Sequence, residues 1–250
     1  MIATYNLLRF TRNFWLSLVM ILAFFVAFTI YVQAEKRVDT ANDLRFSAHA
    51  LGNELRQSSE DLTRMARAYV TSGQAIYRQY YDEIVAIRNG QAERPLNYHE
   101  IYWDLVLADN QRPRASSGKK IPFRELMQQA NISATEFAKL QLALDNSDRL
   151  RVLELQAMDL AQAQFIANPK SPAPALALLT NNDYRTAKAS IMWPIAQYHQ
   201  MMEARTLATV EHAQAVAMQL RILVVVISIL MIALLWRAYQ SLQFTLGAPI

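Results

Sequence analysis

Few side chains in this sequence have types and spacings suited to chemistry, and their pattern does not favour catalysis. The histidines show no metal-ligand spacing with neighbouring carboxylates: His49, His99, His199 and His212. Acidic pairs such as Glu60 and Asp61 occupy adjacent helical positions, so their side chains point apart. The chain has five glycines, and none forms a glycine-rich phosphate loop. We therefore expect no catalytic residue, no metal site and no cofactor.

Arginines on one expected helix form the first candidate ligand site. Arg64 and Arg67 lie beside an apolar seam, and Arg56 lies two turns earlier. In a two-fold dimer, such arginines from both copies could meet and bind an anion through charge-assisted hydrogen bonds. The alternative is that they are exposed and pair with Glu60 and Asp61. The spacing leaves both interpretations open.

The second candidate is a polar interruption in a long apolar helix pattern. The sequence has Asn146, Ser147, Arg151 and Glu154 where the apolar stripes should continue. Buried polar groups must be hydrogen-bonded. These four residues therefore predict either a layer that fixes the helix register or contacts to a ligand, and we expect this polar layer to take part in signalling.

The third candidate is the aromatic stretch RPLNYHEIYWDLV, residues 94–106. On an expected helix, Tyr98, Tyr102 and Leu105 share one face, and Trp103 lies on a neighbouring face. The cluster predicts a small core that caps the bundle or an aromatic-walled pocket, and one cluster can be both. The preceding helix and the loops would add tyrosines, and arginines for an anionic group: Tyr77, Tyr80, Tyr81, Arg88, Arg94 and Arg112.

These candidates lie on a pattern of helices, so the expected fold is an all-α antiparallel bundle. A heptad seam with 4-3-4-3 spacing consists of Leu44, Ala48, Leu51, Leu55, Ser58, Leu62, Met65 and Tyr69. No turn residue separates it from the apolar run before it, so one helix should continue to about Ser72 and end at Ser-Gly. A second long helix should begin at Ser133 with a capping box to Glu136, and a third near Asn182. The segment 74–131 should be an insertion of three short helices (75–88, 97–107 and 122–129) at the membrane-distal end.

Two apolar runs predict a membrane protein. Residues 13–34 contain no charge, and residues 221–237 form a second run that starts with Arg221, which could snorkel to the interface. A cleaved signal peptide is the alternative for the first run, because Val32-Gln33-Ala34 is a passable cleavage site. The run is longer than a signal-peptide core, so a retained span is favoured.

The charge distribution indicates the orientation of the spans. The chain carries 25 basic and 21 acidic residues, a net charge of +4. All the acidic residues and all the basic ones except Arg9, Arg12, Arg221 and Arg237 lie in the segment 35–220, which is therefore neutral. By the positive-inside rule both termini should be cytoplasmic. A neutral external segment excludes a nucleic-acid-binding domain, which needs a basic patch.

Several stretches resemble recurring motifs of a helical input domain: LRQSSEDLTRMARAYVTSG (55–73), RPLNYHEIYWDLV (94–106), NSDRLRVLELQAM (146–158) and YRTAKASIMWPI (184–195). The closing LGAPI (246–250) resembles the opening of a HAMP linker. On the basis of these motifs and this ending, the chain resembles the sensory half of bacterial transmembrane receptors, namely chemoreceptors, sensor histidine kinases and membrane diguanylate cyclases. Because it stops where HAMP should begin, we expect a fragment of a longer receptor.

The resemblance implies a division into a cytoplasmic stub (1–12), a span (13–34), a periplasmic sensor bundle (35–220), a span (221–237) and a linker (238–250) in the bacterial inner membrane. The heptad seam predicts a parallel homodimer. The expected function is detection of a small ligand or a periplasmic partner protein, with the signal passed through the helices to a cytoplasmic output. The alternative is a membrane-anchored coiled-coil scaffold without a ligand, which would need neither an aromatic insertion nor a HAMP-like ending.

Overall fold

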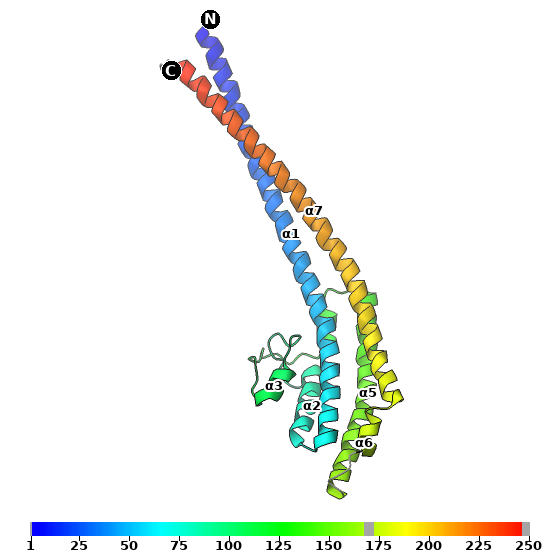
Figure 1. Cartoon of the computed structure of the whole chain (residues 1–250). Helices are drawn as coiled ribbons and strands as arrows, with labels where there is room; N and C mark the ends of the chain where they lie inside the picture. Colours follow the sequence, from blue (N-terminus) through cyan, green and yellow to red (C-terminus); the bar gives the residue numbers. More distant parts are fainter. Residues whose placement is uncertain (1, 168–172, 247–250) are drawn as a thin grey trace. The chain divides into compact units, whose positions relative to one another are not determined.

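The structure is a computed structural model that describes residues 2–167 and 173–246, and these residues form helices and loops without a strand (Figure 1). This confirms the all-α prediction. The helices are α1 (Ile2–Ser72), α2 (Ala75–Arg88), α3 (Trp103–Asp109), α4 (Phe123–Gln129), α5 (Ala134–Ala167), α6 (Ala173–Leu178) and α7 (Asn182–Leu246). They divide into unit 1 (residues 1–43 and 206–250) and unit 2 (residues 44–205).

The ends of the long helices follow local sequence signals. α1 is one helix to Ser72, as predicted, and Gly73 then adopts φ +70° while its N–H donates to the Tyr69 carbonyl at 2.8 Å. A glycine in this left-handed conformation is a common way to end a helix. At the start of α5, the Ser133 N–H donates to Glu136 Oε2 (2.8 Å) and the Glu136 N–H donates to Ser133 Oγ (3.2 Å). The predicted capping box is confirmed.

The insertion is less helical than predicted. α2 and α4 lie where expected, but α3 begins only at Trp103, so a helix from residue 97 was wrong. The backbone before α3 pairs elsewhere: the Arg94 N–H donates to the Lys119 carbonyl and the Leu96 N–H to the Ala115 carbonyl, both at 3.0 Å. Tyr98 and Tyr102 therefore do not share a helix face. The short α6 occupies a connection for which the sequence predicted no helix, and residues 168–172 lie outside the described part of the chain.

Unit 2 is an antiparallel bundle of α2, α5 and the parts of α1 and α7 that fall in this unit. The Tyr198 hydroxyl donates to the Ala48 carbonyl (2.6 Å) and Lys188 Nζ donates to the Ser59 carbonyl (2.8 Å), so α1 and α7 run in opposite directions. The heptad seam is buried inside this single chain except for Leu44, which is half-buried. The seam therefore packs the bundle itself, and a homodimer would have to use another face.

Gly52, in the middle of α1, allows two aromatic rings of α7 to approach the helix backbone. A Cβ added there would lie 2.6 Å from His199 Cε1 and 2.8 Å from Tyr198 Cε1. Glycine inside a helix is otherwise unfavourable by about 1 kcal/mol relative to alanine. Close packing of α1 against α7 thus explains this glycine.

We expect Gly52→Ala to destabilise unit 2 by about 1–3 kcal/mol, despite the better helix propensity of alanine, because the new methyl group overpacks this contact. Chemical denaturation of the full chain in detergent, followed by circular dichroism, measures the change. In Gly52→Ala/His199→Ala, part of the loss should be recovered. A single Gly52→Ala variant more stable than the wild type would contradict the prediction.

Unit 1 contains the two apolar segments, which pack against each other. The residues that contact the partner helix are spaced alternately three and four apart, the period of a coiled coil. On α1 they include Ala27, Tyr31, Ala34, Val38 and Ala41, and on α7 Thr206, Val210, Ala213, Ala217 and Leu220. Many of the other large apolar side chains are exposed, and both helices are long and apolar enough to cross a membrane. At one end of the apolar segments Arg221 pairs with Glu35 at 2.7 Å.

Candidate functional site

The centre of the bundle in unit 2 is a buried carboxylate, Glu154 of α5, with only 1 % of its surface exposed. The Tyr184 hydroxyl of α7 donates to Glu154 Oε1 at 2.7 Å, and the Tyr81 hydroxyl of α2 donates to Oε2 at 3.0 Å. Thr63 Oγ1 of α1 lies 3.1 Å from Oε1. Each of the four bundle helices thus supplies one member of a hydrogen-bonded cluster.

A lysine extends this cluster. Lys188 Nζ of α7 lies 2.8 Å from the Ser59 carbonyl, 2.9 Å from Ser59 Oγ and 3.1 Å from Thr63 Oγ1. An ammonium group has three N–H donors, and all three find an acceptor here. Thr63 therefore bridges the lysine and Glu154. We call Ser59, Thr63, Tyr81, Glu154, Tyr184 and Lys188 the polar cluster.

Burial disfavours the charged forms in the polar cluster. It raises the pKa of Glu154, although the hydrogen bonds from Tyr184, Tyr81 and Thr63 and the charge of Lys188 act in the opposite direction. Burial likewise lowers the pKa of Lys188 to about 8, with Glu154 opposing the shift. Charged groups in such a site are favourable only while their partners stay in place. The packing of the four helices and the ionisation of this cluster are therefore coupled.

Of the four predicted polar-layer residues, only Glu154 belongs to this cluster, and the other three make contacts elsewhere along α5. Besides Glu154, Ser147 is buried and its Oγ accepts from Arg88 Nη1 at 2.9 Å. Arg151 is half-buried and its Nη1 lies 3.3 Å from the Asp148 carboxylate, which also pairs with Arg88. Burial lowers the pKa of Arg88. Two arginines thus share one carboxylate between α2 and α5.

Asn146, the remaining predicted layer residue, lies at the contact of α5 with α7. Its Nδ2 donates to the Ser190 carbonyl at 2.7 Å. It does not reach Glu154, so the structure brings only part of the predicted layer together.

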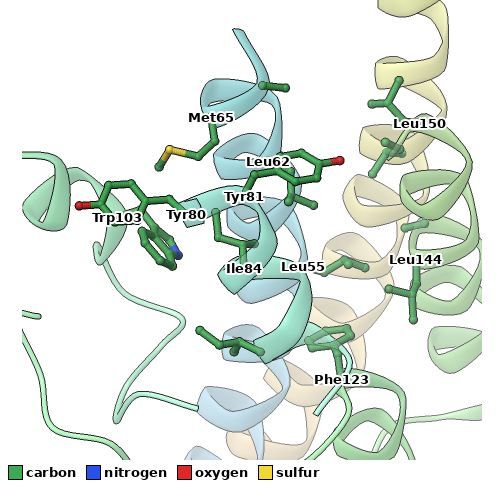
Figure 2. Close-up of a cluster of buried hydrophobic side chains, with 14 of the residues drawn as sticks. Leu55, Leu62, Met65, Tyr80, Tyr81, Ile84, Trp103, Phe123, Leu144 and Leu150 are labelled. Carbon is green, nitrogen blue, oxygen red and sulfur yellow. The ribbon is translucent and has the colours of Figure 1, made fainter. Parts of the chain in front are cut away.

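The aromatic residues of the insertion form a closed core. Trp103 is fully buried, its indole Nε1 donates to the Tyr98 hydroxyl at 2.7 Å, and its ring packs against Tyr80 and Tyr102 with centroids 5.3 and 5.4 Å away. The Arg112 guanidinium lies 5.3 Å from the Trp103 ring. In Figure 2 Tyr80 and Trp103 lie together on one side of α2. This geometry supports the small-core interpretation.

Tyr81, which the sequence grouped with these aromatics, belongs to the polar cluster instead. Figure 2 shows its side chain on the other side of α2 from Tyr80 and Trp103. Arg94 lies beside the aromatic core, where it pairs with Glu54 of α1 and stands 5.9 Å from the Tyr98 ring centroid. Burial lowers the pKa of Arg94 to about 10. The insertion is therefore tied to α1 by a partly buried ion pair.

Arg64 and Arg67, which the sequence predicted to bind an anion together, contact different partners. Arg67 Nη2 donates to the Leu179 carbonyl at 2.9 Å, and its guanidinium lies 5.4 Å from the Tyr184 ring centroid. Arg64 pairs with Asp61 on its own helix and with Asp104 on α3. Within one chain both arginines have partners, and an anion shared between them is not evident.

A hollow of about 230 Å³ lies beside Arg64, between α1 and the loop that leads into α3. Its lining carries charges of both signs and one apolar side chain: Arg56, Gln57, Glu60, Asp61, Arg64, Ile101 and Asp104. Asp61 is 4 % exposed, and burial together with the charges of Asp104 and Glu60 raises its pKa to about 7, although Arg64 opposes the shift.

Several residues of the polar cluster and of the hollow were missed by sequence reasoning. Lys188 is one for which a signal existed. It stands in the apolar spacing of α7 that runs through Tyr184, Ile191, Ile195 and Tyr198, just as Glu154 interrupts α5. Thr63 and Asp61 carried no such signal, because Ser, Thr and Asp are ordinary on a helix surface.

Two histidines form a separate contact between α1 and α7. The His49 and His199 ring centroids are 4.9 Å apart. Burial lowers the pKa of His199 from its ordinary 6.5, the electrostatic effects of the neighbouring His49 and Arg56 lower it further, and Glu203 acts in the opposite direction. Glu203 also pairs with Arg45 of α1.

Acidification is therefore expected to weaken unit 2 through His199. In the folded state its pKa is depressed, so below about pH 6.5 the unfolded chain binds a proton that the folded chain resists. The contribution of neutral His199 to stability is present above that pH and is lost as the pH falls through the folded pKa.

The difference in unfolding free energy between wild type and His199→Gln, measured from pH 7.5 to 5, isolates this contribution. The wild type should lose stability relative to the variant as the pH falls. His212→Gln, at an exposed position, is the control and should track the wild type. A constant difference between wild type and His199→Gln would contradict the expectation.

Among the described residues, no group of three or more histidines and carboxylates is placed to hold a metal ion. Comparison of the chain with models of protein families, with curated proteins and with solved structures gives no match.

Proposed function

We propose that this chain is the sensory input region of a two-span bacterial membrane receptor. The observation that carries the proposal is that α1 and α7, which supply Thr63, Tyr184 and Lys188 to the polar cluster, each continue into one of the two apolar segments. A change in the packing of the cluster would thus act on two helices that are long and apolar enough to cross a membrane. The four motifs that resemble a receptor input domain also support this function.

In this proposal the spans lie in the bacterial inner membrane, both termini are cytoplasmic and residues 35–220 are periplasmic. The receptor is a homodimer, and a ligand or a periplasmic partner protein is the stimulus. The output follows a HAMP-like linker and is of the methyl-accepting, histidine kinase or diguanylate cyclase type. The motif LGAPI supports this part from sequence alone, because residues 247–250 lie beyond the described structure.

The polar cluster is the element that the stimulus biases. A ligand shifts a two-state equilibrium only through its different affinity for the two states, and a complete switch needs about 5.5 kcal/mol. Buried polar groups that lose their partners are unfavourable by about 1–3 kcal/mol each, so rearrangement of this cluster supplies energies of the right size. A scaffold without a ligand gains little from a buried lysine and glutamate, since apolar packing would serve it as well.

Residues 1–250 grafted onto a reporter output at a HAMP junction test this function. Arg151→Leu removes one of the two arginines that share Asp148, and it should shift the basal output toward one signalling state at normal protein level. Arg124→Leu is the matched control, because Arg124 pairs with Asp145 on an exposed surface at 3.2 Å. Unchanged basal output in Arg151→Leu would exclude the group of Arg88, Asp148 and Arg151, which lies beside the polar cluster, from the switch.

The proposed orientation has its own test. The chain has no cysteine, so single cysteines report one position each. Ser116→Cys, at an exposed insertion site, should react with a membrane-impermeant thiol reagent in intact cells, and Ser241→Cys should react only after the cells are opened. Labelling of the Ser241 variant alone in intact cells would reverse the orientation.

A further inference from the structure

We propose that the hollow between α1 and α3 binds a small zwitterion, an α-amino acid with an apolar side chain. The amino acid carboxylate would bind Arg56, its ammonium group Asp61 and Asp104, and its side chain Ile101. The inference rests on the receptor function proposed above and names the class of its ligand.

The charges that line the hollow do not balance one to one. Arg56 pairs with Glu60 at 2.8 Å, and Arg64 is shared by the carboxylates of Asp61 and Asp104. Three carboxylates of the lining thus share two guanidinium groups, and the charge of Lys188 also acts on Glu60 and Asp61. The ammonium group of a bound zwitterion would pair with the buried Asp61 and with Asp104, whereas Glu60, which the ligand carboxylate displaces from Arg56, is exposed and can be left to water.

Asp61 makes this preference stronger. Its side chain is almost completely buried, and the neighbouring carboxylates of Glu60 and Asp104 raise the energy of its ionised form. An ammonium group beside it would stabilise the ionised form directly. Hydrogen bonds between charged partners in a partly buried site are about twice as strong as neutral ones.

The same hollow has a place for a carboxylate. Arg56 and Glu60 are both largely exposed, and such surface pairs contribute only about 0.2–1 kcal/mol. A ligand carboxylate can therefore replace Glu60 on the Arg56 guanidinium at little loss. The guanidinium offers paired N–H donors that match a carboxylate.

The size and the apolar wall of the hollow limit the ligand. Pockets for drug-sized molecules have volumes of about 300–1,000 Å³, whereas this hollow has about 230 Å³. Ile101 is 63 % exposed and gives an apolar side chain a surface to cover. The loop that carries it is held to α1 by a hydrogen bond from Gln57 Nε2 to the Glu100 carbonyl at 2.7 Å. A small amino acid with an aliphatic side chain fits these limits.

The position of the hollow connects binding to the rest of unit 2. Arg56 and Asp61 belong to α1, whereas Asp104 belongs to α3 and Ile101 to the loop before it. A bound zwitterion would therefore tie the insertion to the helix that carries Ser59 and Thr63 of the polar cluster.

Isothermal titration of the purified chain of residues 1–250 in detergent with L-leucine tests the proposal. Leucinamide lacks the carboxylate, and N-acetyl-leucine lacks the ammonium group. We expect saturable leucine binding and at least tenfold weaker binding of both analogues. Equal binding of leucinamide would indicate a simple cation site, equal binding of N-acetyl-leucine an anion site, and absence of leucine binding no amino acid site; each overturns the proposal.

Variants locate the binding in the hollow. Asp104→Asn and Arg56→Gln change exposed side chains, so the fold should be kept, and each should weaken leucine binding at least tenfold. Asp159→Asn and Arg124→Gln remove equivalent charges on exposed pairs elsewhere and should leave the affinity unchanged. Unchanged affinity in both hollow variants would overturn the assignment.

Failure of this inference and failure of the receptor function give different results. If Arg151→Leu shifts the basal output of the reporter fusion but no probe binds, the amino acid site is contradicted and the receptor function is supported. If leucine binds the hollow and no variant changes the reporter output, the amino acid site is supported and the receptor function is contradicted.

Discussion

Glu154→Ala is expected to lower the unfolding free energy of the full chain by about 2–5 kcal/mol, because it leaves buried hydroxyl groups without their acceptor, at about 1–3 kcal/mol for each unsatisfied group. The Tyr184 and Tyr81 hydroxyls would lose their acceptor, and Lys188 would lose the largest attractive charge in its surroundings. Urea denaturation in detergent, followed by circular dichroism, measures the loss.

Glu154→Gln is the matched variant, since it keeps the shape and one acceptor oxygen of the side chain. The raised pKa of Glu154 means that burial already favours its neutral form, so the glutamine should cost much less stability than the alanine. Equal losses in the two variants would show that the negative charge, rather than the hydrogen bonds, holds the cluster together. A loss below 1 kcal/mol in Glu154→Ala would contradict the cluster's structural importance.

Trp103→Ala is expected to destabilise the insertion by about 3–5 kcal/mol, the usual range when a buried aromatic residue is truncated to alanine. The substitution removes the ring that packs between Tyr80 and Tyr102 and leaves the Tyr98 hydroxyl without its donor. Limited proteolysis should then cut the loop between α3 and α4 faster than in the wild type, and the denaturation midpoint should fall.

Trp193→Ala provides the control for this change, because Trp193 on α7 is 69 % exposed. Its stability and its proteolysis pattern should match those of the wild type. If Trp103→Ala also behaved like the wild type, the aromatic cluster would not be the core of the insertion.

The parts of the fold that sequence reasoning predicted correctly are those that depend on neighbouring residues. The capping box at Ser133 and Glu136 and the end of α1 at Gly73 each involve residues within four positions of one another. The predicted start of α3 was wrong because the backbone N–H groups of Arg94 and Leu96 donate to carbonyls 25 and 19 positions away. No local pattern indicates such pairings.

The candidate site was predictable only in part for a similar reason. Glu154 could be singled out because it interrupts an apolar stripe, but its partners depend on how four helices are aligned along their axes. Thr63 is 91 residues from Glu154, and Tyr81 is 73 residues away. Asn146 satisfied the same pattern as Glu154 and yet contacts a different helix, because the register between α5 and α7 places it beside Ser190.

The contribution of one residue from each bundle helix to the Glu154 contacts has a mechanical consequence. If any one of these helices slid by a single turn, about 5.4 Å, its hydroxyl or carboxylate would lose every partner in the cluster at once. Hydrogen bonds span donor–acceptor distances of only about 2.5–3.2 Å, so axial displacements that keep the contacts are restricted to roughly an ångström. Rotation of a helix about its own axis is restricted in the same way. The bundle can therefore pass from one arrangement to another only by giving up these contacts together, which makes the transition abrupt rather than gradual.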